Sequence, residues 1–512
     1  MFKKLFVSST SACFELTNKN PYYSPAPYTV YLNGAKVGGK RATNVFSLFD
    51  LTPATTYTVK CDADGKELTF TTLEDSAVID VKSLGAKADG KSDDTYYVQM
   101  AIDSCPKGGR VVLTEGKYLV RPIVLKGDVT FELKKGATLL GDIREESYPY
   151  IPASTTVGGK EEVTASWEGL PFDCHQSFVS AYRQKNIKVI GEGTINGNAD
   201  KSTWWATPKG RKVARPRLVF LNKCENVVFH GVTCKNSASW NLHPFFSKNL
   251  GFYDVKVQNP YTGPNTDGLD PESCDKVDIV GCEFSVGDDC CAIKSGKLYM
   301  GKTYKTPASN HTLRNNLFQN GHGAIVLGSE MSGGVKNLSV SQCVFKHTDR
   351  GLRIKTRRGR GKDGIIDGVV FENIKMDNVI TPLVINMYYF CDPDGHTEFV
   401  WSRKALPVDE GTPYLGKFVF KDIECVNCEC MAGYFDGLVE QPIKEIRIEN
   451  VSFSFKEDAK PFLPAMLENV REYCKEGIYV DNVETLILKN VTFDGVQGEK
   501  IIKKNCGNVV EE

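Results

Sequence analysis

A short strand pattern recurs along most of this chain and limits the folds that it can adopt. In each copy an aliphatic alternation ends in a Gly or Asn turn, and neighbouring copies lie mostly 23 to 35 residues apart. Copies begin at Asn186, Asn226, Asn249, Lys276, Asn337, Glu445 and Glu484. Self-similarity at this period, with strands and almost no helical periodicity, predicts an all-β solenoid. A single coil cannot bury its apolar face, so stacking must supply the core.

One amphipathic helix is expected before the repeats begin. Residues 92–94 (Ser-Asp-Asp) offer an N-cap, and Val98, Ala101 and Ile102 form an apolar face. We expect this helix to close the N-terminal end of the solenoid, where unpaired strand edges invite aggregation.

Residues 1–75 follow a different pattern and are expected to form a small β-sandwich. Short alternating runs are separated by turn pairs such as Asn33-Gly34 and Asp64-Gly65. The stretch 51–59 around Tyr57 resembles the tyrosine-corner region of fibronectin type III domains. We therefore predict a fibronectin type III-like domain over 1–75, a linker over 72–80, and a catalytic solenoid over 78–512. The small domain would pack beside the cleft or act as a spacer.

Composition excludes several classes of protein. The 512 residues contain 63 basic and 63 acidic side chains, which gives no overall reason to bind nucleic acid or an anionic membrane. No apolar run approaches the 18 residues of a membrane span. The 17 cysteines and an N-terminus whose apolar run ends at Ser8 favour the cytoplasm over secretion. Cys425, Cys428 and Cys430 are expected to be buried strand cysteines, because no fourth metal ligand stands out.

Two motifs bring three carboxylates together if the chain is a solenoid. Asp267 lies in the stretch 265–270, and Asp288 and Asp289 follow Gly287, 21 and 22 residues after Asp267. Stacked coils are about 4.8 Å apart, and this spacing is about one coil, so the three should be neighbours. Their repulsion should raise the pKa of at least one, and glycoside hydrolysis needs a protonated acid beside an ionised base. Taken singly, each motif also fits a turn or a calcium site.

Two later motifs add a histidine and two cations. His322 stands between glycines, 33 residues after Asp289, and Arg353 and Lys355 follow about 30 residues later. In a strand Arg353 and Lys355 point to one face, which suits a carboxylated ligand. Each motif alone fits a turn or a solvated face. The order and spacing of all four favour one site on a solenoid wall.

Together these motifs resemble a known family. Asn265-Thr266-Asp267, Gly287-Asp288-Asp289, Gly321-His322-Gly323 and Arg353-Ile354-Lys355 match, in order, the four signature motifs of polygalacturonases, glycoside hydrolase family 28. The resemblance covers roughly residues 78–500. It implies a right-handed parallel β-helix and an inverting hydrolase of pectic galacturonides.

The resemblance also assigns roles to residues. It implies Asp288 as general acid, Asp267 and Asp289 as the groups that hold and activate water, and His322 as a residue that tunes the acid. Arg353 and Lys355 would bind the galacturonate carboxylate. Further substrate-binding candidates are Asn265, Lys294 and Tyr388, with Tyr389 as an alternative to Tyr388. No metal and no organic cofactor are expected.

Two geometric expectations follow. Adjacent strand residues point to opposite faces, so Asp288 and Asp289 can both face a cleft only if Gly287 allows a bulge or turn. We therefore expect a break in the strand there. Inversion also predicts about 6.5–9.5 Å between the acid and base carboxyl groups, which leaves room for water.

The basic run and two long segments bear on the substrate. Residues 353–362 contain six cations, which predicts local attraction of a polyanion. Segments 143–178 and 388–416 are irregular, and we expect them to close one end of the groove and restrict cutting to chain ends. The stretch 323–330 also resembles the exo-acting bacterial branch. The expected partner is a pectic oligosaccharide or polygalacturonate, and the sequence does not reveal the oligomeric state.

Three alternatives stay open. The substrate could be rhamnogalacturonan, xylogalacturonan or an unsaturated oligomer. The protein could instead be a calcium-dependent β-helix pectate lyase, which would release unsaturated products and lose activity with a chelator. It could also be a non-catalytic sugar-binding solenoid, which would bind pectin without releasing reducing ends.

Overall fold

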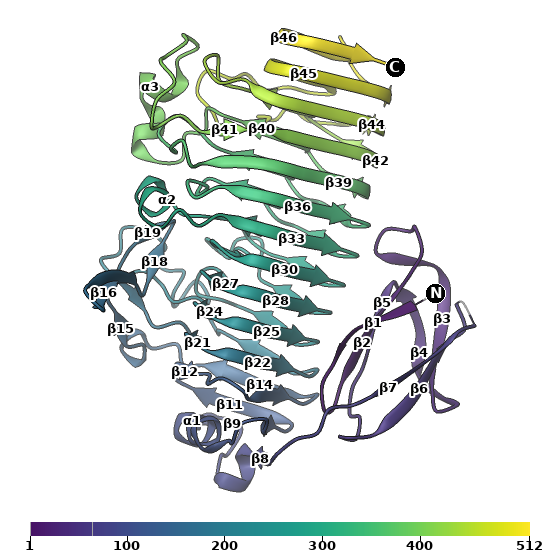
Figure 1. Ribbon diagram of the computed structural model, residues 1–512, viewed down its shortest axis with the longest axis vertical. Helices are drawn as coiled ribbons and strands as arrows, with labels where there is room; N and C mark the ends of the chain where they lie inside the picture. The colour runs from purple at the N-terminus through teal and green to yellow at the C-terminus, as the bar shows by residue number, and fades with distance from the viewer. Residues whose placement is uncertain (1, 64) are drawn as a thin grey trace.

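The computed structural model describes residues 2–63 and 65–512 and contains two kinds of β structure (Figure 1). A small pair of antiparallel sheets comes first, followed by a long stack of parallel coils. Of the turn predicted at Asp64-Gly65, Asp64 lies outside the described residues.

The N-terminal part consists of two antiparallel sheets around one core. One sheet contains β1 (Phe2–Val7), β2 (Ala12–Leu16) and β5 (Val45–Leu48), and the other contains β4 (Ala35–Thr43), β3 (Tyr23–Leu32), β6 (Thr56–Cys61) and β7 (Glu67–Thr71). Both sheets contribute buried side chains to this core, among them Phe14, Val30, Phe46, Val59 and Phe70. Two half-buried sheets thus cover each other, which is how alternating strands remove apolar surface from water.

The remaining chain winds through three ribbons of parallel strands, which we call faces A, B and C. Successive coils pair in register along each face. Face A contains β8 (Val78–Asp80), β10 (Arg110–Leu113), β13 (Thr130–Leu133), β22 (Lys185–Ile190), β25 (Glu225–His230), β28 (Lys248–Tyr253), β30 (Asp275–Val280), β33 (Ala308–Arg314), β36 (Val335–Ser341), β39 (Ile365–Asp377), β42 (Lys417–Cys428), β44 (Ile443–Phe455), β45 (Glu476–Asp494) and β46 (Ile501–Glu511).

The other two faces complete each coil. Face B contains β9 (Asp89–Asp93), β11 (Gly116–Val120), β14 (Ala137–Gly141), β23 (Thr194–Asn196), β26 (Thr233–Lys235), β29 (Lys256–Gln258), β31 (Glu283–Ser285), β34 (Leu317–Gln319) and β37 (Val344–Lys346). Face C contains β12 (Ile123–Val124), β21 (Val179–Tyr182), β24 (Val219–Asn222), β27 (Leu242–Phe245), β32 (Asp289–Ile293), β35 (Gly323–Gly328), β38 (Arg350–Lys355), β40 (Thr381–Asn386) and β43 (Met431–Asp436). This architecture is the predicted parallel β-helix.

The repeated asparagines explain how the chain turns in the same way at each coil. Asn186, Asn226 and Asn249 all adopt a left-handed backbone with φ of 56 to 58°. Asparagine tolerates this region better than most residues. Their side chains also stack, because Asn226 Nδ2 donates to Asn186 Oδ1 and Asn249 Nδ2 donates to Asn226 Oδ1, each at 3.1 Å. The sequence repeat is therefore a ladder of equivalent turns.

The predicted N-terminal helix is confirmed as α1 (Thr95–Ser104), which lies at the first coils (Figure 1). Val98, Ala101 and Ile102 are buried in the solenoid core. The N-cap residue is Asp94, and the carboxylate of the preceding Asp93 accepts the N–H of Thr95 at 3.0 Å. The helix thereby covers apolar surface that no preceding coil can bury.

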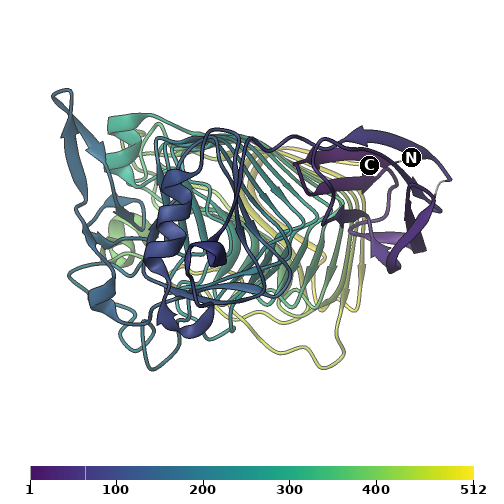
Figure 2. The ribbon, with the colours of Figure 1, turned by 90° about the horizontal axis from the view of Figure 1, so that it is seen from below.

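Segments outside the coils gather on one side of the stack (Figure 2). They carry the hairpin pairs β15 (Tyr150–Ile151) with β20 (Cys174–His175), β16 (Ser154–Val157) with β17 (Lys160–Val163), and β18 (Ser166–Trp167) with β19 (Leu170–Pro171). The same side carries α2 (Leu298–Tyr304) and α3 (Glu398–Trp401). Further short elements are η1 (Val81–Leu84), η2 (Glu145–Ser147), η3 (Pro393–His396) and β41 (Tyr414–Leu415).

The N-terminal sheets dock on the opposite side from these segments (Figure 2). The contact includes buried polar groups: His230 lies between Ser11 and Ser47, at 3.0 and 2.9 Å. Arg314 also pairs with Glu15 at 2.9 Å. The two roles left open for this part, packing beside the cleft and acting as a spacer, both stay predictions.

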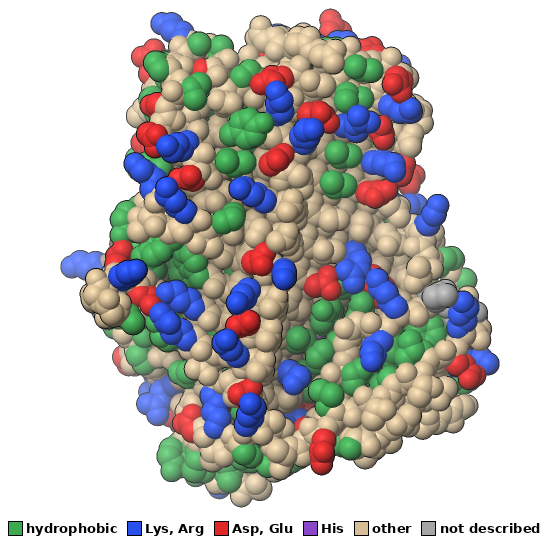
Figure 3. All heavy atoms as spheres, viewed as in Figure 1, with side chains coloured by type: hydrophobic (Ala, Val, Ile, Leu, Met, Phe, Trp, Pro, Cys, Tyr) green, Lys and Arg blue, Asp and Glu red, His purple; other side chains and the backbone are tan. Residues whose placement is uncertain are grey.

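The surface and the thiols agree with the composition. Acidic and basic side chains are interspersed over the face drawn in Figure 3 rather than gathered by sign. Cys425, Cys428 and Cys430 are free thiols and are buried as predicted. Within the described part of the chain, no helix is long and apolar enough to cross a membrane.

Candidate active site

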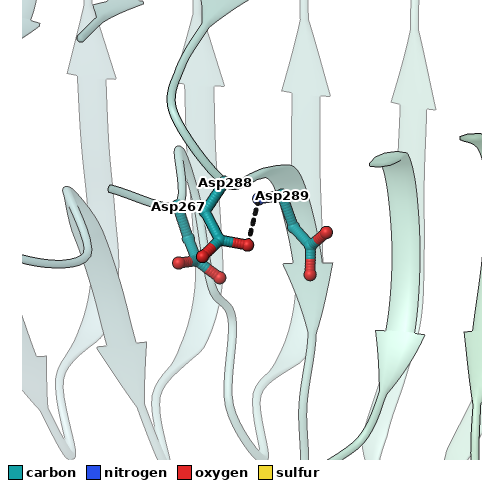
Figure 4. Close-up of side chains that lie close together, drawn as sticks. All are labelled: Asp267, Asp288 and Asp289. Atoms are coloured by element: carbon teal, nitrogen blue, oxygen red, sulfur yellow. Dashed lines mark hydrogen bonds between the residues drawn. The ribbon is translucent and has the colours of Figure 1, made fainter. Parts of the chain in front are cut away.

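Face C brings the predicted carboxylates together. Leu269 and Cys291 are bridge partners on adjacent coils, so Asp267 and Asp289, each two residues earlier, are also neighbours. Oxygens of Asp267, Asp288 and Asp289 all lie within 4.8 Å of one another (Figure 4). The prediction that one coil separates these residues is confirmed.

The expected break in the strand is also confirmed. β31 ends at Ser285 and β32 begins at Asp289, and the intervening residues bend. Gly287 is needed there, because a Cβ would lie 2.4 Å from the carbonyl oxygen of Gly263 and 2.6 Å from that of Pro260. This bend leaves Asp288 outside the strand, with its Oδ1 accepting the N–H of Asp289 at 3.0 Å.

The three carboxyl groups lie close together, with one oxygen of each within 4.8 Å of the others. Consecutive coils place Asp267 and the bend at Asp288 side by side. The predicted separation of about 6.5–9.5 Å refers to whole carboxyl groups rather than to their nearest oxygens, so it stays a prediction.

Asp289 is held as a carboxylate by two cations from the third motif. Lys355 Nζ donates to Oδ2 at 2.7 Å, and Arg353 Nη1 donates to Oδ1 at 3.2 Å. Asp289 is buried, which by itself would raise its pKa, but Lys355 and Arg353 together hold that pKa well below its usual range. The second carboxylate of the motif is therefore the ionised one.

Its neighbours shift the other way. Burial and the negative charge of Asp289 raise the pKa of Asp288. Burial, followed by the charges of Asp270 and Asp288, raises the pKa of Asp267 well above its usual range. Two adjacent positions in the chain thus carry carboxyl groups of opposite protonation tendency, as an acid–base pair requires.

His322 lies at the rim of this pocket, from the coil after Asp288. Its Nδ1 is 2.8 Å from Asp349 Oδ2, and this contact raises the pKa of His322, opposed by partial burial and helped by the charge of Asp288. The ring of Tyr261 packs edge-on against it at 5.6 Å. A protonated imidazole here places a positive charge beside Asp288.

Lys294 lies beneath the pocket. Its Nζ is 3.4 Å from Glu330, 3.6 Å from Asp267 and 3.7 Å from Asp270. It also lies 3.9 Å above the ring of Trp240. Lys294 is buried among these carboxylates, and its assignment as a substrate-binding residue stays a prediction. It supplies charge to the floor of the site.

The two tyrosines face different surroundings. Tyr388 is buried against Arg403, whose guanidinium lies 3.7 Å from its ring centroid. Tyr389 packs beside the basic pair, with Lys355 Nζ 5.6 Å from its ring. Both tyrosines are buried and Tyr389 lies beside Lys355, so the choice of Tyr388 over Tyr389 stays a prediction. Asn265 contacts Arg215, which donates to its Oδ1 at 2.6 Å.

Most of the basic run does not face the cleft. Arg357 pairs with Asp392 and Asp394, Arg358 pairs with Glu440 at 2.6 Å, Arg360 pairs with Asp392, and Lys362 pairs with Glu410. Arg357, Arg358 and Arg360 are buried. The expectation that the whole run attracts a polyanion is wrong, because internal carboxylates neutralise its second half.

The two long segments meet beside the pocket. The N–H of Lys297 donates to the carbonyl oxygen of Gly169 at 2.8 Å, and its Nζ contacts Asp392 at 2.8 Å. Gly169 lies so close to Glu330 that a Cβ would be 2.6 Å from that side chain. Lys297 therefore links segments 143–178 and 388–416 beside Glu330, at the floor of the site.

Several residues of this site escaped the sequence reasoning. Asp270 lies in the stretch 265–270 but was not among the predicted site residues. The sequence of residues 267–270 does not show that the carboxylates of Asp267 and Asp270 are both buried. Trp240 and Arg217 lie in register with Asp267 on the two preceding coils. Their spacing of 27 and 50 residues from Asp267 was a usable signal. Asp349 carried none.

Comparisons with known proteins agree with this geometry. The model of the glycosyl hydrolases family 28 matches residues 127–399. An endo-polygalacturonase of Pectobacterium carotovorum is 32% identical over 319 residues, covering 59% of this chain and 74% of that protein. An exo-poly-α-D-galacturonosidase of Dickeya chrysanthemi is 28% identical over 417 residues, covering 73% and 67%. The structure of the Yersinia enterocolitica family 28 exopolygalacturonase superimposes with a TM-score of 0.75 at 21% identity, covering 99% of this chain and 98% of that one.

Proposed function

The chain belongs to glycosyl hydrolases family 28, and from that premise we propose that it hydrolyses α-1,4-galacturonosyl bonds of pectic galacturonides from chain ends. The observation that carries this proposal is the pairing of adjacent acids. Asp288 has a raised pKa, while Asp289 is held ionised by Lys355 and Arg353. Hydrolysis of a glycosidic bond needs a proton donor and a base at one bond, and this pocket contains both.

Each residue has a role in this proposal. Asp288 gives its proton to the glycosidic oxygen as the bond breaks. Asp289 and Asp267 hold the attacking water, and Asp289 accepts its proton. His322 keeps a positive charge near Asp288, which sets the pH at which the acid is lost. No step in this scheme needs a metal or an organic cofactor.

Recognition of an acidic sugar rests on the same cations. Lys355 has three N–H donors and uses one on Asp289, so two remain for a galacturonate carboxylate. Arg353 lies on the same outward side of β38, and Tyr389 packs beside them. We propose Arg353, Lys355 and Tyr389 as the carboxylate-binding wall, with Asn265 on the opposite side of the acids.

The stereochemical outcome is a separate proposal. We infer inversion from the family, in which one carboxyl group acts as acid and another activates water. A nucleophilic carboxylate would have to be free, and Asp289 is held by two cations. We expect the first product from the α-linked substrate to be the β-anomer. Proton NMR within seconds of mixing decides this, and an initial α-anomer would contradict it.

Exo action is supported by Lys297, which links segments 143–178 and 388–416. A groove closed at one end admits only a chain terminus. The decisive experiment is a product profile on polygalacturonate and on short oligogalacturonides. One short product from the first minutes supports chain-end cleavage. A ladder of sizes would indicate internal cleavage, and the absence of new reducing ends would overturn hydrolysis.

One alternative deserves a specific control because the three clustered carboxylates could also hold a cation. A calcium-dependent lyase would release products that absorb in the ultraviolet and would stop when a chelator is added. Two cations already neutralise Asp289, which disfavours a metal there. We expect unchanged reducing-end release in chelator and no ultraviolet signal. Rhamnogalacturonan and xylogalacturonan serve as substrate controls, because other pectic backbones remain possible within this fold.

For the N-terminal part we propose a fibronectin type III-like sandwich over residues 1–75 that acts as a spacer. The hydroxyl of Tyr57 accepts the N–H of Thr52 at 2.9 Å, a contact of the tyrosine-corner type. We also propose that residues 78–512 form a β-helix of right-handed sense. The 17 cysteines support a further proposal, a cytoplasmic location. Fractionation of the producing cells tests the location.

A further inference from the structure

A cavity of about 420 Å³ lies on face C beneath segment 143–178. Ser166, Cys174, Tyr182, Arg215, Arg217 and Phe220 are among its lining residues. They come from the covering segment and from β21, β24 and the chain just before β24. Apolar and small polar groups form most of the wall, and two arginines supply its charge. None of the roles assigned above uses this cavity.

The strand register places the cavity on the same track as the acids. Val219 pairs with Leu242, and Leu242 pairs with Leu269. Arg217, Trp240 and Asp267 each lie two residues before one of these three partners. They therefore follow one another on successive coils. At about 4.8 Å per coil, Arg217 lies roughly 10 Å from Asp267 along the solenoid axis. One or two sugar units span such a distance.

Arg215 and Arg217 are buried cations without an acidic partner. Arg215 is 0% exposed and Arg217 is 3% exposed. Arg215 donates to the carbonyl oxygens of Ala238 and Pro264 and to Asn265, and Arg217 donates to the carbonyl oxygens of Ser166 and Arg215 and to the hydroxyl of Ser239. Within residues 2–63 and 65–512, neither forms an ion pair with a carboxylate, and neither Nε has an acceptor.

This lack of a partner is unusual in the same molecule. The buried Arg357, Arg358 and Arg360 each pair with Asp or Glu. Removing a guanidinium from water is costly unless a carboxylate compensates it. Burial lowers the pKa of Arg215 to about 10, helped by the charge of Arg217, in the direction expected for an uncompensated pair. An anionic ligand would remove this cost.

Two aromatic residues pack around Arg217. Its guanidinium carbon lies 4.6 Å from the ring centroid of Trp167 and 4.5 Å from that of Trp240. The two indoles are nearly parallel, at 10°, with their centroids 6.3 Å apart. These contacts hold Arg217 in place, and its planar guanidinium suits a carboxylate. Trp167 comes from the covering segment, so the wall itself builds this arrangement.

We propose that Arg215 and Arg217 form a second carboxylate-binding subsite. This subsite binds the terminal uronate of the substrate at the closed end of the groove, on the opposite side of the acids from Arg353 and Lys355. This inference rests on the proposed function and specifies its substrate: a chain carrying a free carboxylate on its terminal sugar. The cavity then selects chain ends by the negative charge of the terminal sugar as well as by its closed shape. Methyl-esterified or neutral ends should bind poorly.

The test is a binding cycle in the Asp288→Asn background, measured by calorimetry. The probes are trigalacturonate and two analogues in which the carboxyl group of one or the other terminal sugar is reduced to an alcohol. We expect Arg217→Gln to raise the Kd for trigalacturonate by about 10- to 100-fold, as for a lost charge-assisted contact. Reduction at one end should cost a similar factor, and the two changes combined should cost no more than either alone.

The control is Arg183→Gln, which removes an exposed guanidinium that pairs with Glu162 and stacks on Tyr182 at the same cavity. It should change every Kd by less than about twofold. Equal weakening of all three probes by Arg217→Gln, or no weakening, would overturn the subsite. If wild type releases no sugar from galacturonides while the Arg217-dependent cycle holds, the proposed function fails and the subsite stands.

Arg217→Gln removes a buried stacked group, so its melting temperature must be measured alongside. If the variant does not fold, a crystal structure of Asp288→Asn with trigalacturonate decides. A sugar carboxylate within hydrogen-bond distance of Arg215 or Arg217 supports the subsite. A ligand bound with its carboxylates elsewhere, or no ligand in the cavity, overturns it.

Discussion

Two halves of one basic stretch do different work. Arg353 and Lys355 lie in β38 and contact Asp289 in the pocket. Arg357, Arg358 and Arg360 follow within a few residues, yet they pair with carboxylates of segment 388–416 and with Glu440. Composition is the same in both halves, and the backbone makes the difference.

Strand alternation explains the first half. Leu352 and Ile354 are buried in the core, so Arg353 and Lys355 must point outward onto face C. The strand ends at Lys355, and the chain then turns beneath segment 388–416. The later cations are enclosed there and become part of the scaffold. A cation recognises substrate only if its register exposes it to the cleft.

The greatest effect is expected from replacing Asp288, the proposed acid next to the Asp289 that Arg353 and Lys355 contact. We expect Asp288→Asn to lower the kcat for reducing-end release by about 10³-fold, because the amide cannot donate the proton. Its melting temperature should stay near that of wild type, since within the described residues the Asp288 carboxylate accepts one hydrogen bond, from the N–H of Asp289. Retention of most activity would remove Asp288 from the role of acid.

Lys355→Ala tests the substrate half of the basic stretch directly. We expect kcat/KM on oligogalacturonides to fall by about 10²-fold, because both a sugar contact and the partner of Asp289 are lost. Activity on any neutral glycoside that is cleaved should fall far less. The matched control is Lys362→Ala, an exposed ion pair in the same stretch, which should change kcat/KM by less than about twofold. Equal losses on acidic and neutral substrates would argue against carboxylate recognition.

Much of this site was predictable because, in a solenoid, residues that lie one coil apart in the sequence lie side by side in space. Asp267, Asp288 and Asp289 met as predicted, and Gly287 broke the strand as predicted. Period-two alternation also placed Lys355 correctly. In each case a local rule and the coil length were sufficient.

The sequence was least informative where no local rule applies. Tyr388 and Tyr389 both follow the end of β40, and the turn there places Tyr389 beside Lys355. The partners of Arg358 and His322 come from distant segments whose paths no repeat specifies.

Arg358→Gln tests the scaffold half. Arg358 and Glu440 are both nearly inaccessible, so removing one partner leaves a buried charge. We expect the free energy of unfolding to fall by roughly 3 kcal/mol, measured by denaturant titration. The ratio of kcat/KM on acidic and neutral substrates should stay within about twofold of wild type. A changed ratio would mean that the second half of the stretch also reads the substrate.

The smallest expected effect concerns the pH dependence set by His322. Asp349→Asn removes the contact that raises the pKa of His322, so the imidazole should titrate at lower pH in an NMR titration. A raised histidine pKa stabilises the fold fully below its unfolded value, about 6.5, and this contribution disappears as pH rises through the folded value. The variant should therefore lose melting temperature at acidic pH and approach wild type at alkaline pH. Protonated His322 helps to set the pKa of Asp288. The basic limb of the pH dependence of kcat/KM should therefore move together with the imidazole titration. The preference for acidic over neutral substrates, which Lys355 provides, should stay unchanged. A shifted imidazole with an unmoved limb would separate His322 from the acid and leave Asp288 governed by burial and Asp289 alone.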